Sequence, residues 1–206
     1  MKYFQPEAET MSAADKRALQ SEKLVKTVKY VYERQKPYRE KMDAIKLRPS
    51  DIKGIEDIWK LPYTMKSDLR ANYPFGMMAA DRKDLVRLHA SSATTGKLTV
   101  SGHTMHDIEV WADCAARSLV MAGADENSIV HVCYGYGLFT GGLGMHYGAE
   151  RLGAIAVPAS AGNTQRQLQL LTDFGADIIC CTPSYAIYLI EEMEKAGLKP
   201  GRDIKL

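Results

Sequence analysis

Four short apolar runs in the second half of the chain alternate with amphipathic segments, and this alternation constrains the fold more than any other feature. The runs predict buried strands at 85–88, 129–133, 154–157 and 178–181. The segments between them open with helix-start signals at Thr104-x-x-Asp107, Thr164-x-x-Gln167 and Thr182-Pro183. Alternating strand and helix predicts an α/β fold with a mainly parallel sheet flanked by helices.

The first eighty residues have a different character. Leu24, Val28, Val31 and Tyr32 share one helical face behind a Ser12-x-x-Asp15 capping box, which predicts an amphipathic helix. Prolines then divide the segment into short helices and turns, at positions 37, 49, 62 and 74. We therefore predict a small helical cap over residues 1–80, followed by an α/β subdomain over residues 81–206. Tyrosines 30, 32 and 38 are assigned to the core of the cap rather than to a ligand.

The C-terminal residues resume the strand pattern. After Gly197 and a Pro200-Gly201 turn, Asp203–Leu206 resembles the start of a further strand. A sheet that ended there would leave an apolar edge unpaired. We therefore expect the α/β subdomain to be incomplete at its C-terminus, as in a truncated chain.

Charge and hydropathy exclude several classes of partner. The 27 basic and 25 acidic residues give a formal net charge of +2, which argues against nucleic acid or anionic lipid as a partner. The N-terminus lacks an apolar signal core, and no run approaches the roughly 18 apolar residues of a membrane span. We predict a cytoplasmic protein whose partners are small molecules.

The thiols and imidazoles do not form a recognisable metal motif. Cys114, Cys133, Cys180 and Cys181 lack CxxC spacing and are interpreted as reduced core thiols. A zinc site that uses His131 and Cys133 is an alternative, but His-x-Cys on a strand is more often packing, so no metal site is predicted. No chemistry is assigned to the histidines, which are His89, His103, His106, His131 and His146.

A hydroxyl-rich turn follows the first apolar run, in the segment Leu88-His-Ala-Ser-Ser-Ala-Thr-Thr-Gly-Lys97. Its hydroxyls, backbone N–H groups and lysine ammonium are hydrogen-bond donors suited to an anion. The spacing does not match the Walker A loop, because Ser91 and Leu98 stand where that motif needs a glycine and a Ser or Thr. The dinucleotide fingerprint also fails, at Gly135-Tyr-Gly-Leu-Phe-Thr140, where threonine replaces the third small residue. We predict phosphate binding, with a simple turn between two strands as the alternative, by Ser91, Ser92, Thr94, Thr95, Gly96 and Lys97.

A second segment, Tyr134–Gly144, carries five glycines among aromatic residues. Glycines let the backbone approach a ligand, and the rings supply flat apolar walls. Because ligands bind outside the carboxyl ends of parallel strands, we expect this segment and the hydroxyl-rich turn to share one sheet edge. The alternative is a glycine-assisted turn with core aromatics.

The hydroxyl-rich turn resembles the Ser/Thr-Ser-Gly-Thr-Thr-Gly-Lys-Pro loop of the adenylate-forming superfamily, although Ala93 and Leu98 replace its glycine and proline. Further motifs resemble phenylacetate–CoA ligases, and they occur in the same order, at Leu61–Arg70, Asn72–Gly76, Tyr134–Gly144, His146–Gly153 and Thr182–Tyr185. The likeness runs from roughly residue 12 to the end of the chain. Within it, Lys66 and Arg70 are interpreted as a solvated helix face, with contact to phosphate or coenzyme A as the alternative.

The resemblance implies the N-terminal part of a larger adenylate-forming domain that ligates phenylacetate, or a similar aryl acid such as benzoate, to coenzyme A. The implied reaction consumes ATP with Mg²⁺, releases AMP and passes through an acyl-adenylate. The resemblance also implies that Tyr136, Phe139, Gly141 and Gly142 contact the acyl group, whereas the catalytic residues stay unknown. The chain alone is expected to be inactive, and a homodimer is compatible with the family. The alternative is a non-catalytic nucleotide-binding or interaction module.

Overall fold

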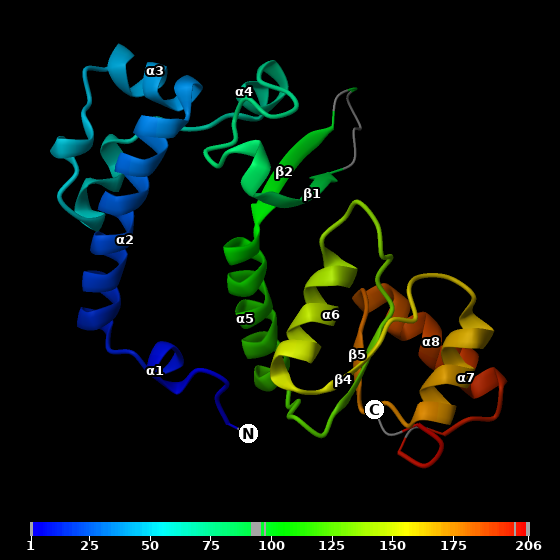
Figure 1. The fold of residues 1–206 in the computed structure, drawn as a ribbon. Helices are drawn as coiled ribbons and strands as arrows, with labels where there is room; N and C mark the ends of the chain where they lie inside the picture. Colours follow the sequence, from blue (N-terminus) through cyan, green and yellow to red (C-terminus); the bar gives the residue numbers. More distant parts are fainter. Residues whose placement is uncertain (1, 92–95, 97, 200, 205–206) are drawn as a thin grey trace. The chain divides into compact units, whose positions relative to one another are not determined.

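The computed structural model describes residues 2–91, 96, 98–199 and 201–204, which form two compact units (Figure 1). One unit is Pro6–His106, and the other is Asp107–Leu206 together with Met1–Gln5. Each unit has its own cluster of buried apolar side chains. The predicted division of the chain at residue 80 stays a prediction.

Helices fill most of the unit Pro6–His106. They are α1 (Pro6–Glu9), α2 (Ala13–Arg34), α3 (Lys36–Ala44) and α4 (Lys66–Ala71), with 3₁₀ turns η1 (Pro49–Asp51), η2 (Ile55–Lys60) and η3 (Arg82–Asp84). The predicted cap of α2 is confirmed, because Ser12 Oγ accepts a hydrogen bond from the Asp15 backbone N–H at 3.1 Å. Val28 packs on the inner face of α2 with Met42, Leu47 and Ile52, as the periodicity predicts.

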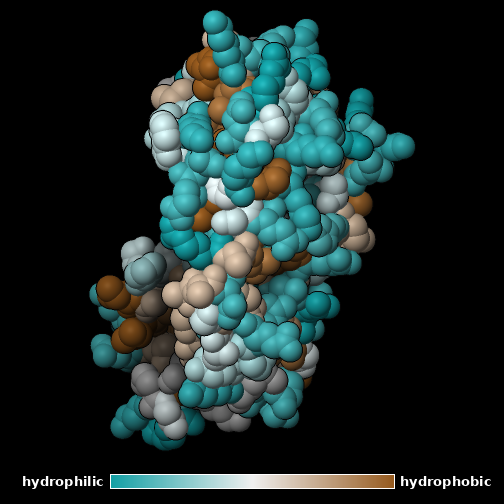
Figure 2. All heavy atoms as spheres, turned by 90° about the vertical axis from the view of Figure 1, so that its left-hand side faces the viewer, coloured by the Kyte–Doolittle hydropathy of each residue, from teal (hydrophilic) through white to brown (hydrophobic). Residues whose placement is uncertain are grey.

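The face of the molecule that Figure 2 shows is mostly hydrophilic, with small separate hydrophobic areas. Tyr32 and Tyr38 pack against the buried cluster, which confirms their core assignment. Tyr30 differs, because its ring is 43% exposed and its hydroxyl donates to the Ala79 carbonyl at 3.2 Å. No helix in the described part of the chain is both long and apolar enough to cross a membrane.

The first predicted strand exists, but its pairing differs from the prediction. β1 (Leu85–Ser91) pairs antiparallel with β2 (Thr99–Thr104) in a sheet of two strands. Residues 92–98 connect the two strands, and this connection is shorter than the roughly dozen residues that a parallel crossover needs. The sequence pattern missed β2 because it is polar and is ordered by pairing rather than by apolar burial. The expected shared sheet edge is therefore wrong, since the strand before Tyr134 belongs to another sheet.

The other unit contains a parallel sheet of three strands in the order β4-β3-β5 (Figure 1). The strands are β3 (Ile129–Val132), β4 (Ile155–Val157) and β5 (Ile178–Cys180). The helices of this unit are α5 (Met105–Met121), α6 (Gly141–Leu152), α7 (Thr164–Phe174) and α8 (Pro183–Lys195). The predicted α/β class is confirmed, with a parallel sheet smaller than the mainly parallel sheet expected.

Alternate side chains of β3 enter two apolar clusters. Val130 and Val132 pack with buried residues of α5 and α6, whereas Ile129 packs with buried residues of α7 and α8. This alternation follows from the period of two in a strand. Because one pair of helices contributes to each cluster, β3 is covered on both faces. The carboxyl end of β3 leads into a loop at the edge of the sheet.

Two helix starts and the chain end refine the sequence predictions. Pro183 opens α8 directly after Thr182, as predicted. α7, however, is capped one residue earlier than expected, because Asn163 Oδ1 accepts the Arg166 backbone N–H at 3.2 Å. In the segment predicted as a further strand, Ile204 forms a single bridge and is buried, while Lys205 and Leu206 lie outside the described residues.

The prediction of reduced core thiols holds for some of the four cysteines. All four cysteines are free, and burial raises the pKa of Cys133 to about 12 and that of Cys180 to about 11. Such thiols stay protonated and behave as small apolar groups. Cys114 corrects the prediction, because it is exposed on α5, between the buried positions Ala112 and Ala115.

Candidate functional site

The hydroxyl-rich turn connects the two paired strands β1 and β2. Ser91 ends β1 and pairs with Thr99 of β2, so the strands bring the two ends of the turn together. Gly96 has a φ of +108°, in the region that favours glycine, and no described atom outside its chain neighbours lies within 4 Å of the place that a Cβ would take. Four of the predicted phosphate-binding residues, and Ala93 beside them, lie outside the described residues, namely Ser92, Thr94, Thr95 and Lys97. The described positions thus explain the glycine of the motif by backbone conformation.

Tyr134 connects the carboxyl ends of two neighbouring strands. It lies two residues after β3, and its hydroxyl donates to the Cys181 carbonyl, just after β5, at 2.8 Å. Burial is the main cause that raises the pKa of Tyr134, so this hydroxyl stays a neutral donor. The loop after β3 is therefore fixed to the loop after β5 at the edge where α/β proteins bind ligands.

Tyr136 extends the same edge. Its hydroxyl lies 3.4 Å from His146 Nδ1, and the two rings meet edge to face with centroids 5.7 Å apart. His146 Nε2 lies 3.1 Å from Glu150 Oε1, one turn further along α6. Burial raises the pKa of Tyr136 to about 12, so its hydroxyl also stays protonated. Tyr136 is thus a half-buried aromatic wall whose hydroxyl has a defined partner.

The other predicted acyl contacts occupy the start of α6. Phe139 precedes the helix and is 60% exposed, and Gly141 is the first residue of α6, near the Tyr134 ring. Gly142 is buried, and a Cβ at this position would lie 2.8 Å from the Gly135 carbonyl oxygen. Backbone packing therefore requires glycine at 142 whether or not a ligand lies nearby.

The remaining glycines of this region fall into two groups. Gly135 and Gly137 have open space where a Cβ would be, so packing does not explain them. Gly144 and Gly148 are packed so closely against α5 that a Cβ would lie 2.6 Å from Trp111 Nε1 and 2.5 Å from Ala115 Cβ, respectively. The glycine pattern thus combines an open loop with a close contact between two helices.

A third loop at the sheet edge was missed by the sequence analysis. Gln167 is fully buried, and its amide donates to the carbonyls of Ser160 at 2.7 Å and Gly162 at 3.1 Å. Its Oε1 lies 2.7 Å from His131 Nε2, and because the amide is used as a double donor, His131 is the donor in this contact. The polar residue Gln167 is the signal in the sequence that could have revealed this loop contact, but the Thr164-x-x-Gln167 pattern predicts a capping box instead.

Left-handed backbone angles characterise the loop that Gln167 holds. Ser160, Gly162 and Asn163 have φ values of +64°, +86° and +47°. Residues other than glycine occupy this region rarely, and they do so where surrounding contacts determine the conformation. The buried amide of Gln167 supplies such contacts. His131 is therefore part of the hydrogen-bond network that holds this loop. The described residues contain no group of three or more His, Cys, Asp or Glu that could hold a metal ion.

Burial lowers the pKa of His131 and outweighs its hydrogen bond to Gln167, which acts in the opposite direction. The unfolded chain therefore takes up a proton near pH 6.5 that the folded chain resists. We expect stability to fall on acidification below about pH 6.5, by up to about 1.4 kcal/mol per pH unit, until the folded histidine titrates as well. Urea midpoints between pH 7.5 and 5.5 should decrease less steeply in the double variant His131→Leu/Gln167→Leu. Equal pH dependences would contradict this assignment.

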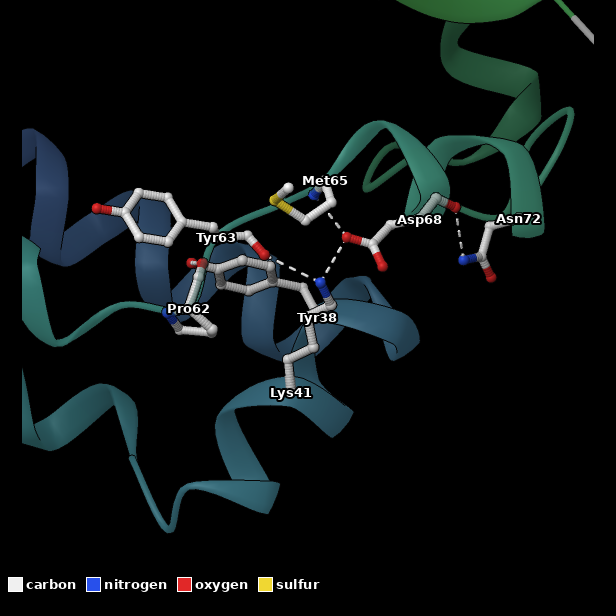
Figure 3. Close-up of polar contacts among 7 residues, drawn as sticks. All are labelled: Tyr38, Lys41, Pro62, Tyr63, Met65, Asp68 and Asn72. Atoms are coloured by element: carbon white, nitrogen blue, oxygen red, sulfur yellow. Dashed lines mark hydrogen bonds and ion pairs between the residues drawn. The ribbon is translucent and has the colours of Figure 1, made fainter. Parts of the chain in front are cut away.

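The motif at residues 61–72 has a structural explanation (Figure 3). Lys41 of α3 donates to the Tyr63 carbonyl at 2.9 Å and forms an ion pair with Asp68. Asp68 also accepts the Met65 backbone N–H at 2.6 Å, and both contacts lower its pKa, with the lysine contact first. Lys66 is exposed as predicted, whereas Arg70 is half-buried. The segment is thus held against α3 by hydrogen bonds and an ion pair.

The fold is shared with solved CoA ligases. An open conformation of 2-hydroxyisobutyryl-CoA ligase in complex with 2-HIB-AMP and CoA superposes with a TM-score of 0.88 and 31% sequence identity, covering 96% of this chain and 47% of that one. A second structure of that ligase, in the thioesterification state, gives a TM-score of 0.89, 31% identity and coverages of 96% and 43%. Over the compared residues, this chain has the fold of part of these ligases, which belong to the adenylate-forming class.

Curated relatives identify the branch of this class. The chain is 51% identical to the phenylacetate-coenzyme A ligase of Thermus thermophilus over 96% of its length, and 52% identical to that of Escherichia coli over 91%. It is 50% identical to that of Aromatoleum evansii over 93%. The chain spans 43 to 44% of the length of these relatives. No family model matches the chain. The predicted resemblance is confirmed: the chain is homologous to part of the phenylacetate-coenzyme A ligases.

Proposed function

We propose that this chain is the N-terminal part of an AMP-forming ligase that joins phenylacetate, or a similar aryl acid, to coenzyme A. The observation that carries the proposal is the roughly one-half identity to phenylacetate-coenzyme A ligases over nearly the whole chain. The loops at the carboxyl edge of the parallel sheet support it, because ligands bind at such edges. A cytoplasmic location and a homodimer stay predictions.

In this proposal, one loop binds the ATP phosphates and another binds the acyl group. A carboxylate is a poor electrophile, so the acid first attacks the α-phosphate of ATP and expels pyrophosphate; the coenzyme A thiol then attacks the acyl-adenylate and expels AMP. The hydroxyl-rich turn, Ser91 to Lys97, orients and neutralises the ATP phosphates. The segment Tyr136–Gly142 lines the acyl group, with Tyr136 as its best-defined wall. The described residues contain no group of three or more His, Cys, Asp or Glu that could hold a metal ion, and no step is assigned to Mg²⁺.

Pyrophosphate exchange tests the proposal directly. The full-length protein that contains this chain should incorporate labelled pyrophosphate into ATP only when phenylacetate or a related aryl acid is present. Acetate is the matched control, since it offers the same carboxylate without the ring. If a folded protein binds ATP but shows no exchange with any aryl acid, the non-catalytic nucleotide-binding module becomes the better assignment.

Removal of the Tyr136 ring should affect one substrate selectively. We expect Tyr136→Ala to raise the KM for phenylacetate about tenfold and to leave the KM for ATP within about twofold, because an apolar wall contributes mainly to binding of the ring. Tyr63→Ala is the matched control, since Tyr63 is 85% exposed. Equal effects of Tyr136→Ala on both substrates would remove Tyr136 from the acyl pocket.

A further inference from the structure

Tyr136, His146 and Glu150 form a chain of polar contacts. The Tyr136 hydroxyl keeps its proton because burial raises its pKa, and it lies 3.4 Å from His146 Nδ1. In the tautomer of His146 that carries its proton on Nε2, Nδ1 accepts from this hydroxyl. In the same tautomer, Nε2 donates to Glu150 Oε1, 3.1 Å away. The contacts are mutually consistent in one tautomer.

Two elements fix this chain of contacts. His146 and Glu150 are four residues apart on α6, so they lie on the same face of the helix. Tyr136 comes from the loop after β3 and packs against the apolar cluster beneath α6. The edge-to-face contact of the two rings, at an interplanar angle of 88°, adds an orientation preference to the hydrogen bond. The helix therefore determines where the tyrosine ring of a glycine-rich loop is held.

We propose that His146, supported by Glu150, is a positioning residue for acyl binding: it anchors Tyr136 as a wall of the acyl pocket. This inference rests on the proposed ligase function. His146 itself does not need to touch the substrate. Since the loop contains Gly135 and Gly137, which packing does not restrain, loss of the anchor leaves the ring several orientations and lowers the fraction ready to bind.

A double-mutant cycle in the full-length protein separates this role from a merely structural one. His146→Phe keeps a ring for the edge-to-face contact but removes the acceptor, and Tyr136→Phe removes the donor. Each variant should raise the KM for phenylacetate about threefold to tenfold, because each loses one hydrogen bond. The KM for ATP should stay unchanged. The double variant should be no worse than either single variant. His146→Gln, which restores an acceptor, should recover most of the effect.

His106→Phe is the control substitution, because His106 is exposed and lies far along the chain from the acyl loop. Additive effects in the cycle, or equal changes in the KM values of both substrates, would overturn the proposal while leaving exchange activity, and hence the ligase function, intact. Absence of aryl-dependent exchange in the unmodified protein would instead overturn the ligase function. In that case ¹⁵N NMR of labelled histidines still tests the anchor: Tyr136→Phe should shift the Nδ1 signal of His146, and an unchanged signal would refute the contact.

Discussion

Alanine in place of Gly148 is expected to destabilise the chain by about 2 kcal/mol, even though alanine favours helices by about 1 kcal/mol over glycine. The added Cβ would lie 2.5 Å from Ala115 Cβ and 2.9 Å from the Ala115 carbonyl carbon. The nearest obstacles are a short side chain and backbone of α5, which cannot rotate away. The helices α5 and α6 would have to separate, and this would loosen the cluster that covers β3.

Urea denaturation followed by circular dichroism measures this effect. Gly141→Ala is the matched control on the same helix, because its Cβ would lie 3.4 Å from the Tyr134 ring, close to ordinary contact. We expect the free energy of unfolding of the Gly141→Ala variant to differ from that of the unmodified protein by less than about 1 kcal/mol. A Gly148→Ala variant as stable as Gly141→Ala would show that the two helices are less closely packed than described.

Gln167→Leu is expected to cost about 3 kcal/mol of stability, because it removes one buried polar side chain and leaves four partners without their hydrogen bonds. The partners are His131 Nε2, Cys133 Sγ and the carbonyls of Ser160 and Gly162. Leucine fills a similar volume, so the loss reports polar groups rather than a cavity. The loop after β4 should also lose its left-handed conformation, which increased proteolysis near Gly162 would detect.

Gln169→Leu is the control for this substitution, since Gln169 lies on the same helix and is exposed. It should change stability by less than about 0.5 kcal/mol. The double variant His131→Leu/Gln167→Leu should be less destabilised than the sum of its single variants, because it removes the buried donor together with its acceptor. Strict additivity would mean that the two side chains do not depend on one another.

Local patterns identified most elements of the fold because their physical cause is local. Apolar runs predicted β3, β4 and β5, since the strands of a parallel sheet are apolar along most of their length. The Ser12 cap and the Thr182-Pro183 start followed from side-chain geometry within one turn of helix. The polar strand β2 was missed because its stability comes from pairing with β1, which no window of sequence contains.

Some features of the candidate site were also predictable from the sequence, and others were decided only by the tertiary structure. Motif order along the chain was sufficient to recognise the ligase resemblance and to select Tyr136, because both depend on residue identity alone. Only the tertiary structure showed that Gly142, Gly144 and Gly148 are required by packing, that Gln167 is buried against His131, and that Tyr136 has His146 as its partner. These contacts join residues of different helices, strands and loops, so burial and hydrogen-bond partners are decided by how the elements pack and not by any one of them.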